Sequence, residues 1–98
     1  MNLFELGRVV MTSGVKEQME QDPSIRSFLD GCLKRHSEGD WGDLCKEDKE
    51  LNNIAILAEK NNKDTDSLLS AYKINKIELW IITEYDRSIT TILLPEEY

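Results

Sequence analysis

The segment LLSAYKINKIELWIITEYDRSITTILL, Leu68–Leu94, determines the fold that we expect. It holds three runs enriched in β-branched and aromatic residues, which favour extended strands. These runs are Leu68–Ile74, Ile77–Glu84 and Ile89–Leu94. Only Asn75-Lys76 and Tyr85–Ser88 separate the runs, and Pro95 ends the last one because it cannot donate a hydrogen bond to a sheet. Connections this short join antiparallel neighbours, so the segment predicts a three-stranded antiparallel meander.

Alternation along the middle run divides its side chains between the two faces of the predicted sheet. One face receives Ile77, Leu79, Ile81 and Thr83, and the other receives Glu78, Trp80, Ile82 and Glu84. A chain of this size has too few helices to cover both faces of a sheet. We therefore expect Trp80 and Ile82 to be partly exposed, and such an aromatic and aliphatic patch is typical of an interaction surface.

The residues before Leu68 have the periodicity of helices. One apolar stripe recurs at intervals of three and four residues, between a helix start at Ser24 and a stop at Gly39. Its members are Ile25, Phe28, Leu29, Cys32, Leu33 and His36. This spacing places them on one face of a single helix.

Two further helices are expected. A brief one covers Val15–Glu20, with Thr12 or Ser13 as its cap, and a longer one runs from about Lys46 to Lys60. The inward face of the longer helix is predicted to carry Leu51, Ile54, Ala55, Leu57 and Ala58. Leu3–Met11 is ambiguous, since its apolar residues fit one face of a short helix.

These elements predict the fold class. The chain has 98 residues, which is enough to bury one modest core. We therefore expect a single domain over residues 1–98 of the α+β class, with N-terminal helices packed on a C-terminal three-stranded antiparallel β-meander.

Charge and cysteine usage narrow the environment and the partners. The net charge is −7, which disfavours direct binding to nucleic acid or to an anionic membrane. This acidity has two explanations, solubility alone or a surface that pairs with a basic protein, and we expect another protein as the partner. No run of residues is long and apolar enough to cross a bilayer, and no signal peptide is visible. Cys32 and Cys45 do not form a CxxC pair. We expect a cytoplasmic protein with two reduced thiols.

The stretch HSEGDWGDL, His36–Leu44, has two interpretations. In the structural one it joins two helices: Asp43 caps the second helix, and Trp41 fixes the loop to the sheet. His36 is then a partly buried histidine bonded to Asp40, Asp43 or a backbone carbonyl. In the functional one, the stretch binds a ligand and His36 is a general acid or base oriented by a carboxylate.

A metal site is a third reading of the same region. Cys32 and His36 are four residues apart on one helix face, and Cys45 follows a glycine-containing loop that allows the chain to fold back. The spacing matches no standard zinc pattern, and Cys32 also fits the apolar stripe. We therefore expect neither a metal nor another cofactor.

A second polar cluster lies at the end of the predicted last hairpin. It includes Glu84, Asp86, Arg87 and Thr90. In the structural interpretation Asp86 and Arg87 pair locally, whereas in the functional one Arg87 recognises a carboxylate or phosphate of a ligand. If the Trp41 loop packs beside this hairpin, the two clusters form one cleft, whose binding candidates also include Trp80.

Several motifs carry a resemblance to a known group of proteins. The pattern HxxGDWGDL, the later SAY, and WIITExDRSxTTILLPEEY at the end resemble small bacterial proteins of plasmids and prophages, called "plasmid-related protein" or labelled as a type I restriction enzyme subunit. The resemblance extends from about Leu3 to Tyr98, although Asn61–Leu68 is longer than the usual link. It implies no established activity. The chain lacks the glycine-rich cofactor loop of a methyltransferase.

Two functions follow from these observations. The first is a non-enzymatic accessory protein of a mobile genetic element, which binds another protein and inhibits a host defence or restriction nuclease by presenting carboxylates in place of DNA phosphates. The alternative is a small enzyme or ligand-binding domain that uses two clusters. They are His36, Asp40 and Asp43, and Glu84, Asp86 and Arg87. The sequence predicts neither the identity of the partner nor the oligomeric state.

Overall fold

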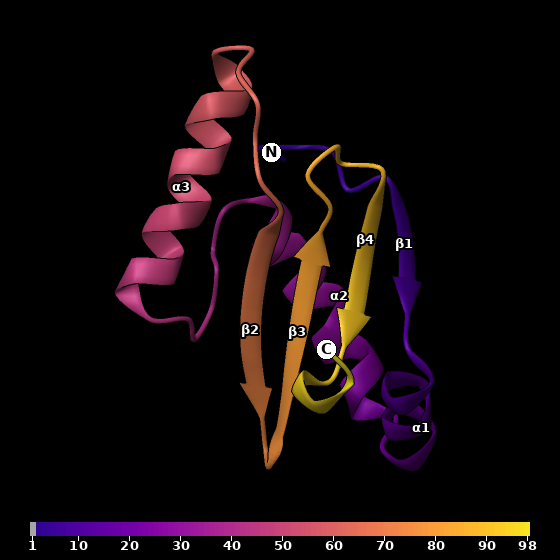
Figure 1. Cartoon of the computed structure of the whole chain (residues 1–98). Coiled ribbons are helices and arrows are strands. Elements are labelled where there is room, and N and C mark those ends of the chain that lie inside the picture. The colour runs from indigo at the N-terminus through magenta and orange to yellow at the C-terminus, as the bar shows by residue number, and fades with distance from the viewer. Residues whose placement is uncertain (1) are drawn as a thin grey trace.

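The computed structural model describes residues 2–98 and confirms the α+β class. Within these residues, three helices and four strands follow one another along the chain (Figure 1). They are β1 (Arg8–Met11), α1 (Ser13–Gln21), α2 (Ser24–Ser37), α3 (Lys46–Lys60), β2 (Leu68–Ile74), β3 (Ile77–Thr83) and β4 (Ile89–Leu93), with a 3₁₀ turn at Pro95–Glu97. The bounds of β2 and α3 agree with the sequence prediction, as do those of α1, β3 and β4 to within two residues.

The sheet has four strands rather than three, in the order β1-β4-β3-β2. The predicted antiparallel pairs β2–β3 and β3–β4 are present, with Ile74 opposite Ile77 across the Asn75-Lys76 turn. The added strand β1 lies parallel to β4, so the sheet is mixed and a strand precedes the helices. Both features correct the expected order of helices followed by a purely antiparallel meander.

The new strand depends on a close approach of two backbones. Gly7 has φ 65°, and a Cβ there would lie 2.3 Å from the carbonyl oxygen of Ser88. Glycine permits both the angle and the approach, and the amide of Arg8 then donates to that same carbonyl at 2.9 Å. From there the β-branched Val9 and Val10 continue along β4.

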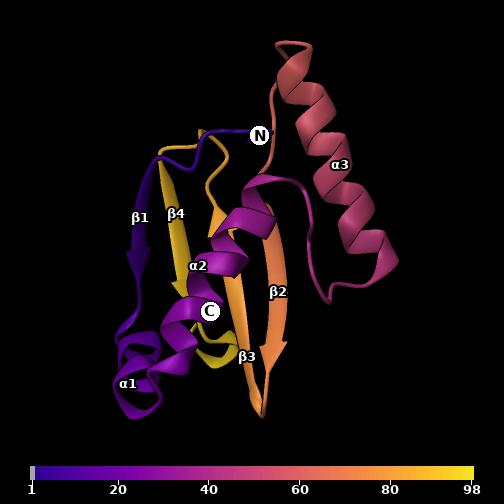
Figure 2. The ribbon, with the colours of Figure 1, turned by 180° about the vertical axis from the view of Figure 1, so that it is seen from behind.

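Helices α1 and α2 cover one face of the sheet (Figures 1 and 2). As predicted, the inward stripe of α2 includes Ile25, Leu29, Cys32 and His36, all of them buried. The main core between these helices and the sheet consists of Val15, Ile25, Leu29, Cys32, Tyr72, Leu79, Ile81, Ile92 and Leu94. Burial of this apolar surface is the main source of stability.

Among the described residues, the other face of the sheet carries no α-helix, and the 3₁₀ turn Pro95–Glu97 lies against its lower end (Figure 1). Trp80 and Ile82 are half-buried there, as expected for side chains on an uncovered face. The strand register places Leu69, Ile82, Thr91 and Val10 in one row across this face. We call it the open face.

Helix α3 stands beyond the free edge of β2, and its predicted inward face is largely wrong. Leu51, Ile54 and Leu57 are 64, 55 and 60% exposed. The buried residues of the helix are Asn52, Ala55 and Ile56, of which only Ala55 was predicted to face inward. The helix packs against a strand edge rather than over the sheet, because α1 and α2 already occupy the inner face. Within residues 2–98, no helix is both long and apolar enough to cross a membrane.

Candidate functional site

The GDWGD segment lies along the outer edge of β2. The carbonyl of Trp41 accepts from the amide of Ala71 at 3.2 Å, and the amide of Asp43 donates to the carbonyl of Ala71 at 2.6 Å. Gly42, at φ 75°, sits between them so close to β2 that a Cβ would lie 2.0 Å from the Ala71 carbonyl oxygen. A carboxylate oxygen of Asp43 also accepts from the amide of Lys73 at 3.1 Å. The motif therefore behaves as a very short additional strand.

Asn52 extends this protection of the β2 edge. Its side-chain amide donates to the carbonyl of Leu69 at 2.7 Å, and its side-chain oxygen accepts from the amide of Leu69 at 3.2 Å. Unpaired strand edges promote association with other strands, and this edge is closed at alternate residues by the chain itself. The expected role of Asp43 as the cap of α3 is wrong: the N-cap is Cys45, without a side-chain hydrogen bond, and Asp43 serves β2.

Trp41 is buried; its backbone carbonyl makes the expected link to the sheet, whereas its side chain fixes the segment to other elements. Its indole N–H donates to the side-chain oxygen of Asn53 in α3 at 3.0 Å. The ring stacks on Phe4 with centroids 6.1 Å apart and meets the ring of His36 edge-on at 5.7 Å. Trp41 thus connects α3, the N-terminal segment and α2.

His36 is fully buried, at 0% exposure, and begins a chain of hydrogen bonds that crosses the core. Its Nδ1 lies 2.5 Å from the hydroxyl of Ser70, and its Nε2 lies 2.9 Å from the hydroxyl of Thr83. The hydroxyl of Thr83 is 2.7 Å from that of Thr90, which donates to the carbonyl of Leu6 at 2.7 Å. His36 therefore connects α2 to β2, β3, β4 and the segment before β1.

The predicted carboxylate partners of His36 are wrong. Asp40 is exposed and pairs with Arg35, with 2.8 Å between Asp40 Oδ2 and Arg35 Nε, and this pair lowers the pKa of Asp40. Asp43 bonds to β2 as described above. His36 was expected to be partly buried and is fully buried, and hydroxyl groups of two strands bond the ring where a carboxylate or a backbone carbonyl was expected.

The order of donors determines the protonation of His36. Because the Thr90 hydroxyl donates to Leu6, it accepts from Thr83, and Thr83 must then accept from Nε2–H of His36. Nδ1 carries no proton and accepts from Ser70. Burial, reinforced by the charge of Arg87, lowers the pKa of His36 to about 3. The ring is neutral in the folded protein, sealed from solvent and fully bonded.

Arg87 is buried, and its guanidinium meets groups of its own chain. Its Nε is 2.7 Å from a carboxylate oxygen of Glu59 in α3, and Nη2 donates to the hydroxyl of Thr65 at 3.0 Å. Nη1 donates to the carbonyls of Asp66 and Glu84 at 2.9 and 3.0 Å. The carboxylate that Arg87 recognises is thus internal, and the residue fixes the end of α3 and the following loop to the β3–β4 turn.

Of the two predicted polar clusters, only His36 and Arg87 come together, and they do so within the interior. Phe4 lies between them: its ring centroid is 5.3 Å from that of His36 and 5.7 Å from the guanidinium carbon of Arg87. Trp41 stacks on the same ring. His36, Trp41 and Arg87 are all buried around Phe4, so they form packed structure where an open cleft was expected.

The remaining predicted residues are distributed over the surface and the core. Asp86 is exposed and accepts hydrogen bonds from the amide and the hydroxyl of Ser88, which lower its pKa. The predicted pairing of Asp86 with Arg87 is therefore wrong. Thr90 is buried in the His36 chain of hydrogen bonds, whereas Glu84 is exposed and lies at the open face with Trp80.

The structure does not bring Cys32, His36 and Cys45, the three residues of the possible metal site, together. Cys32 is buried and Cys45 is exposed, and both are free thiols. Among the described residues no group of three or more histidine, cysteine or acidic side chains is placed to hold a metal ion. Burial raises the pKa of Cys32 to about 11, which keeps this thiol protonated and apolar in character.

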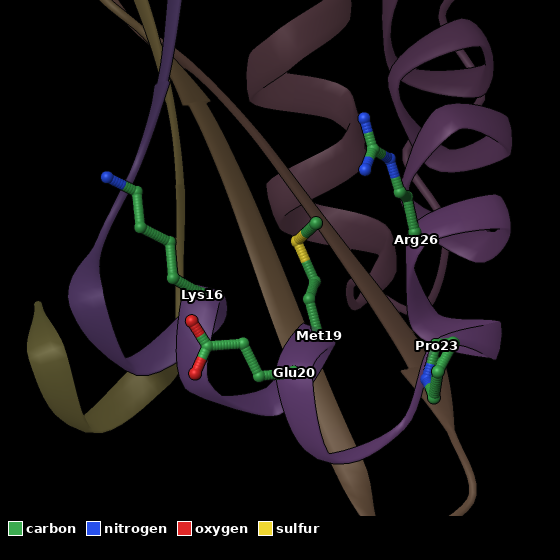
Figure 3. Close-up of a pocket in the computed structure, with 5 residues that line it drawn as sticks. All are labelled: Lys16, Met19, Glu20, Pro23 and Arg26. Carbon is green, nitrogen blue, oxygen red and sulfur yellow. The ribbon is translucent and has the colours of Figure 1, made fainter.

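Surface cavities lie away from the buried clusters. Figure 3 shows one of about 310 Å³ formed by α1, α2 and the turn between them. Its lining residues are Lys16, Met19, Glu20, Pro23 and Arg26. None of them was predicted as a site residue, and no buried polar group points to a ligand there.

A second cavity of about 310 Å³ lies on the open face. It is lined by Ser67, Ile82, Glu84, Thr91, Leu93, Glu97 and Tyr98. We call it the open-face groove. The aromatic ring of Tyr98 lies edge-on to Trp80, with 5.7 Å between centroids, so the groove continues into the Trp80 patch.

No protein-family model, curated protein or solved structure matches this chain. Function is therefore inferred from its own residues. Three structural partners were not predicted from the sequence: Ser70 bonds His36, Asn52 bonds the edge of β2, and Glu59 pairs with Arg87. For Ser70 a signal existed, because a polar residue at an inward strand position implies a buried hydrogen-bond partner.

Proposed function

We propose that this chain is a non-enzymatic accessory protein of a mobile genetic element that acts by binding another protein. The open-face groove is the observation that supports this proposal. It lies on one face of the sheet, and both apolar side chains and carboxylates line it. Half-buried Ile82 and Tyr98, which is 84% exposed, provide the accessible apolar part, and buried Leu93 lies beneath them. An exposed aromatic side chain beside an aliphatic one supports a role of this surface in binding another protein.

The charge of the groove favours a basic partner. Glu84 and Glu97 line it, and none of the described residues that line it is a lysine or an arginine. The hydroxyl of Thr12 and the amide of Leu94 donate to Glu97 and lower its pKa, so this carboxylate is held in place and ionised. A segment with a lysine or arginine beside apolar side chains complements such a groove.

The proposed partner is a host defence or restriction nuclease. Enzymes of this kind bind DNA phosphates with lysine and arginine side chains, and a carboxylate-lined surface competes for the same cations. The net charge of −7 adds long-range attraction to a basic surface. The resemblance to plasmid-related proteins supports the setting of a mobile element.

The enzymatic alternative receives less support from the geometry. The two side chains that it requires most, His36 and Arg87, are buried and bonded to groups of the chain itself. A general base needs a substrate proton within hydrogen-bond distance, and the lone pair of His36 Nδ1 is already directed to Ser70.

The test is protection of incoming DNA in hosts that carry restriction systems. Unmodified plasmid is introduced into cells that express this chain, the Glu84→Lys variant or the matched Glu17→Lys variant, in which the same charge change falls on exposed α1. We expect the unaltered chain and Glu17→Lys to raise transformation, and Glu84→Lys to lose most of this effect.

Binding to the purified nuclease, measured by calorimetry at two salt concentrations, checks the mechanism. Binding is expected to weaken with salt and with Glu84→Lys. Absence of protection against every restriction system tested would reject the proposed target class. Equal binding by Glu84→Lys and Glu17→Lys would reject the groove as the binding surface.

A further inference from the structure

Helix α3 has a second apolar face that no other part of the described chain covers. We propose that this face pairs with α3 of a second copy of the chain, in antiparallel orientation. The inference concerns a different surface from the open-face groove and goes beyond the proposed function.

The spacing of the exposed residues defines this face. Leu51, Ile54 and Leu57 recur every third residue and lie on one side of the helix, because successive residues of an α-helix are rotated by about 100°. Asn52, Ala55 and Ile56 lie on the opposite side and face β2. A helix with apolar residues on two opposite sides is typical of one that is buried on both.

The position of α3 leaves this side accessible. Figures 1 and 2, seen from opposite directions, both place α3 at the outer border of the molecule beyond β2. A second molecule can therefore approach it without meeting the sheet or α1 and α2. The helix itself is held firmly, since Asn52, Asn53 and Glu59 bond to Leu69, Trp41 and Arg87.

Charges along α3 select a second copy as the occupant and an antiparallel orientation. Glu47 and Glu50 line one surface with Lys46 and Leu51 near the start of the helix, so two carboxylates and one ammonium leave this surface acidic by one charge. Lys60 and Lys63 lie at and just after the end of the helix, and both are exposed. A twofold axis beside Ile54 places the acidic start of each helix next to the basic end of the other. It also pairs helix dipoles of opposite direction, whereas parallel pairing would put like charges together.

The same axis satisfies the apolar stripe. Leu51 of one copy meets Leu57 of the other, the two Ile54 side chains meet at the centre, and Glu50 lies within reach of Lys60 of the second copy. The Leu51–Leu57 and Glu50–Lys60 contacts each occur twice, whereas the Ile54–Ile54 contact lies on the axis and occurs once. One helix of 15 residues from each copy makes a small interface, so we expect a weak dimer in rapid exchange.

Sedimentation velocity over a micromolar to millimolar range of protein concentration tests the dimer. We expect concentration-dependent dimerisation of the unaltered chain. Ile54→Glu should raise the dissociation constant at least about tenfold, because each dimer would bury two unpaired carboxylates. Tyr85→Glu is the matched control, because Tyr85 is as exposed as Leu51, at 64%, but lies in the β3–β4 turn. The Tyr85→Glu variant should dimerise like the unaltered chain.

Charge exchange tests the orientation. Glu50→Lys and Lys60→Glu should each weaken the dimer, and the double variant should restore it, because the pair is re-formed with the signs exchanged. A chain that stays monomeric at millimolar concentration, or an Ile54→Glu variant that dimerises normally, would overturn the proposal. Failure of the double variant to recover would overturn the antiparallel orientation. Glu84→Lys should dimerise normally, which separates this result from the test of the groove.

Discussion

His36 and Ser70 are separated by 34 positions in the sequence, yet Nδ1 of the imidazole and Oγ of the serine lie 2.5 Å apart inside the core. The bond joins the C-terminal end of α2 to the middle of β2. Because the other ring nitrogen bonds Thr83, the only histidine of the chain is a fixed polar connection between the helical layer and the sheet. Fully satisfied buried polar groups of this kind favour one arrangement of the core over its alternatives.

A neutral His36 makes the stability of the fold depend on pH. Burial, and then Arg87, lower the pKa of His36 from 6.5 to about 3. Between these values the unfolded chain binds a proton that the folded chain does not, so the free energy of unfolding decreases as the pH falls. We expect a loss of roughly 2 kcal/mol between about pH 7 and about pH 5, measured by urea unfolding.

The carboxylates with lowered pKa values stabilise the folded chain at neutral pH and lose this contribution only below about pH 5. Asp40, Asp86 and Glu97 start from ordinary values of 3.8, 3.8 and 4.5, so the interval above about pH 5 isolates the histidine. NMR provides a direct check, since the imidazole resonances of His36 in the folded protein should stay constant down to about pH 5. A titration near 6.5 in the folded protein would refute the assignment.

Replacing Thr83 by valine should interrupt the chain of hydrogen bonds at its centre. The change retains the β-branched shape but leaves Nε2–H of His36 without an acceptor and removes the donor to Oγ1 of Thr90, which keeps its bond to the carbonyl of Leu6. A buried group without its hydrogen bond is costly, so we expect a loss of about 2–3 kcal/mol in urea unfolding. Thr91→Val, one residue away from Thr90 on the half-exposed open face, should change stability by less than about 0.5 kcal/mol. Equal effects of the two changes would contradict a structural role for the hydroxyl chain.

The elements that the sequence predicts well are those whose period and burial agree. The stripe of α2 and the alternation of β3 each bury one face against the same core, so local pattern and final environment coincide. Strand β1 lacks such a signal, because four residues carry almost no period and the strand exists only through its pairing with β4. Gly7 allows that approach, but its role can be recognised only when its contact with Ser88 is known.

Helix α3 shows a second limit of sequence patterns. Apolar residues recur along it, but a pattern cannot show whether the same chain covers them. Its inward side is decided by Asn52, whose amide matches the free edge of β2. The candidate site has the same limit: His36, Trp41 and Arg87 were identified, but their burial around Phe4 and the pairing of Arg87 with Glu59 depend on tertiary contacts between distant segments.

Gly42 and Gly31 should respond in opposite ways to the same change to alanine. At Gly42 the φ of 75° disfavours a side chain, and the added Cβ would lie 2.0 Å from the carbonyl oxygen of Ala71. The GDWGD segment would have to leave the edge of β2, so we expect Gly42→Ala to lose about 2–3 kcal/mol of stability and to aggregate more readily in light scattering. At Gly31, in α2, nothing lies within 4 Å of the added Cβ, and alanine should stabilise the helix by roughly 0.5–1 kcal/mol. Gly42→Ala should also speed the amide exchange of Ala71 and Lys73, whose N–H groups bond to the GDWGD segment. Full stability together with unchanged exchange at these two amides would show that the motif does not cover this edge.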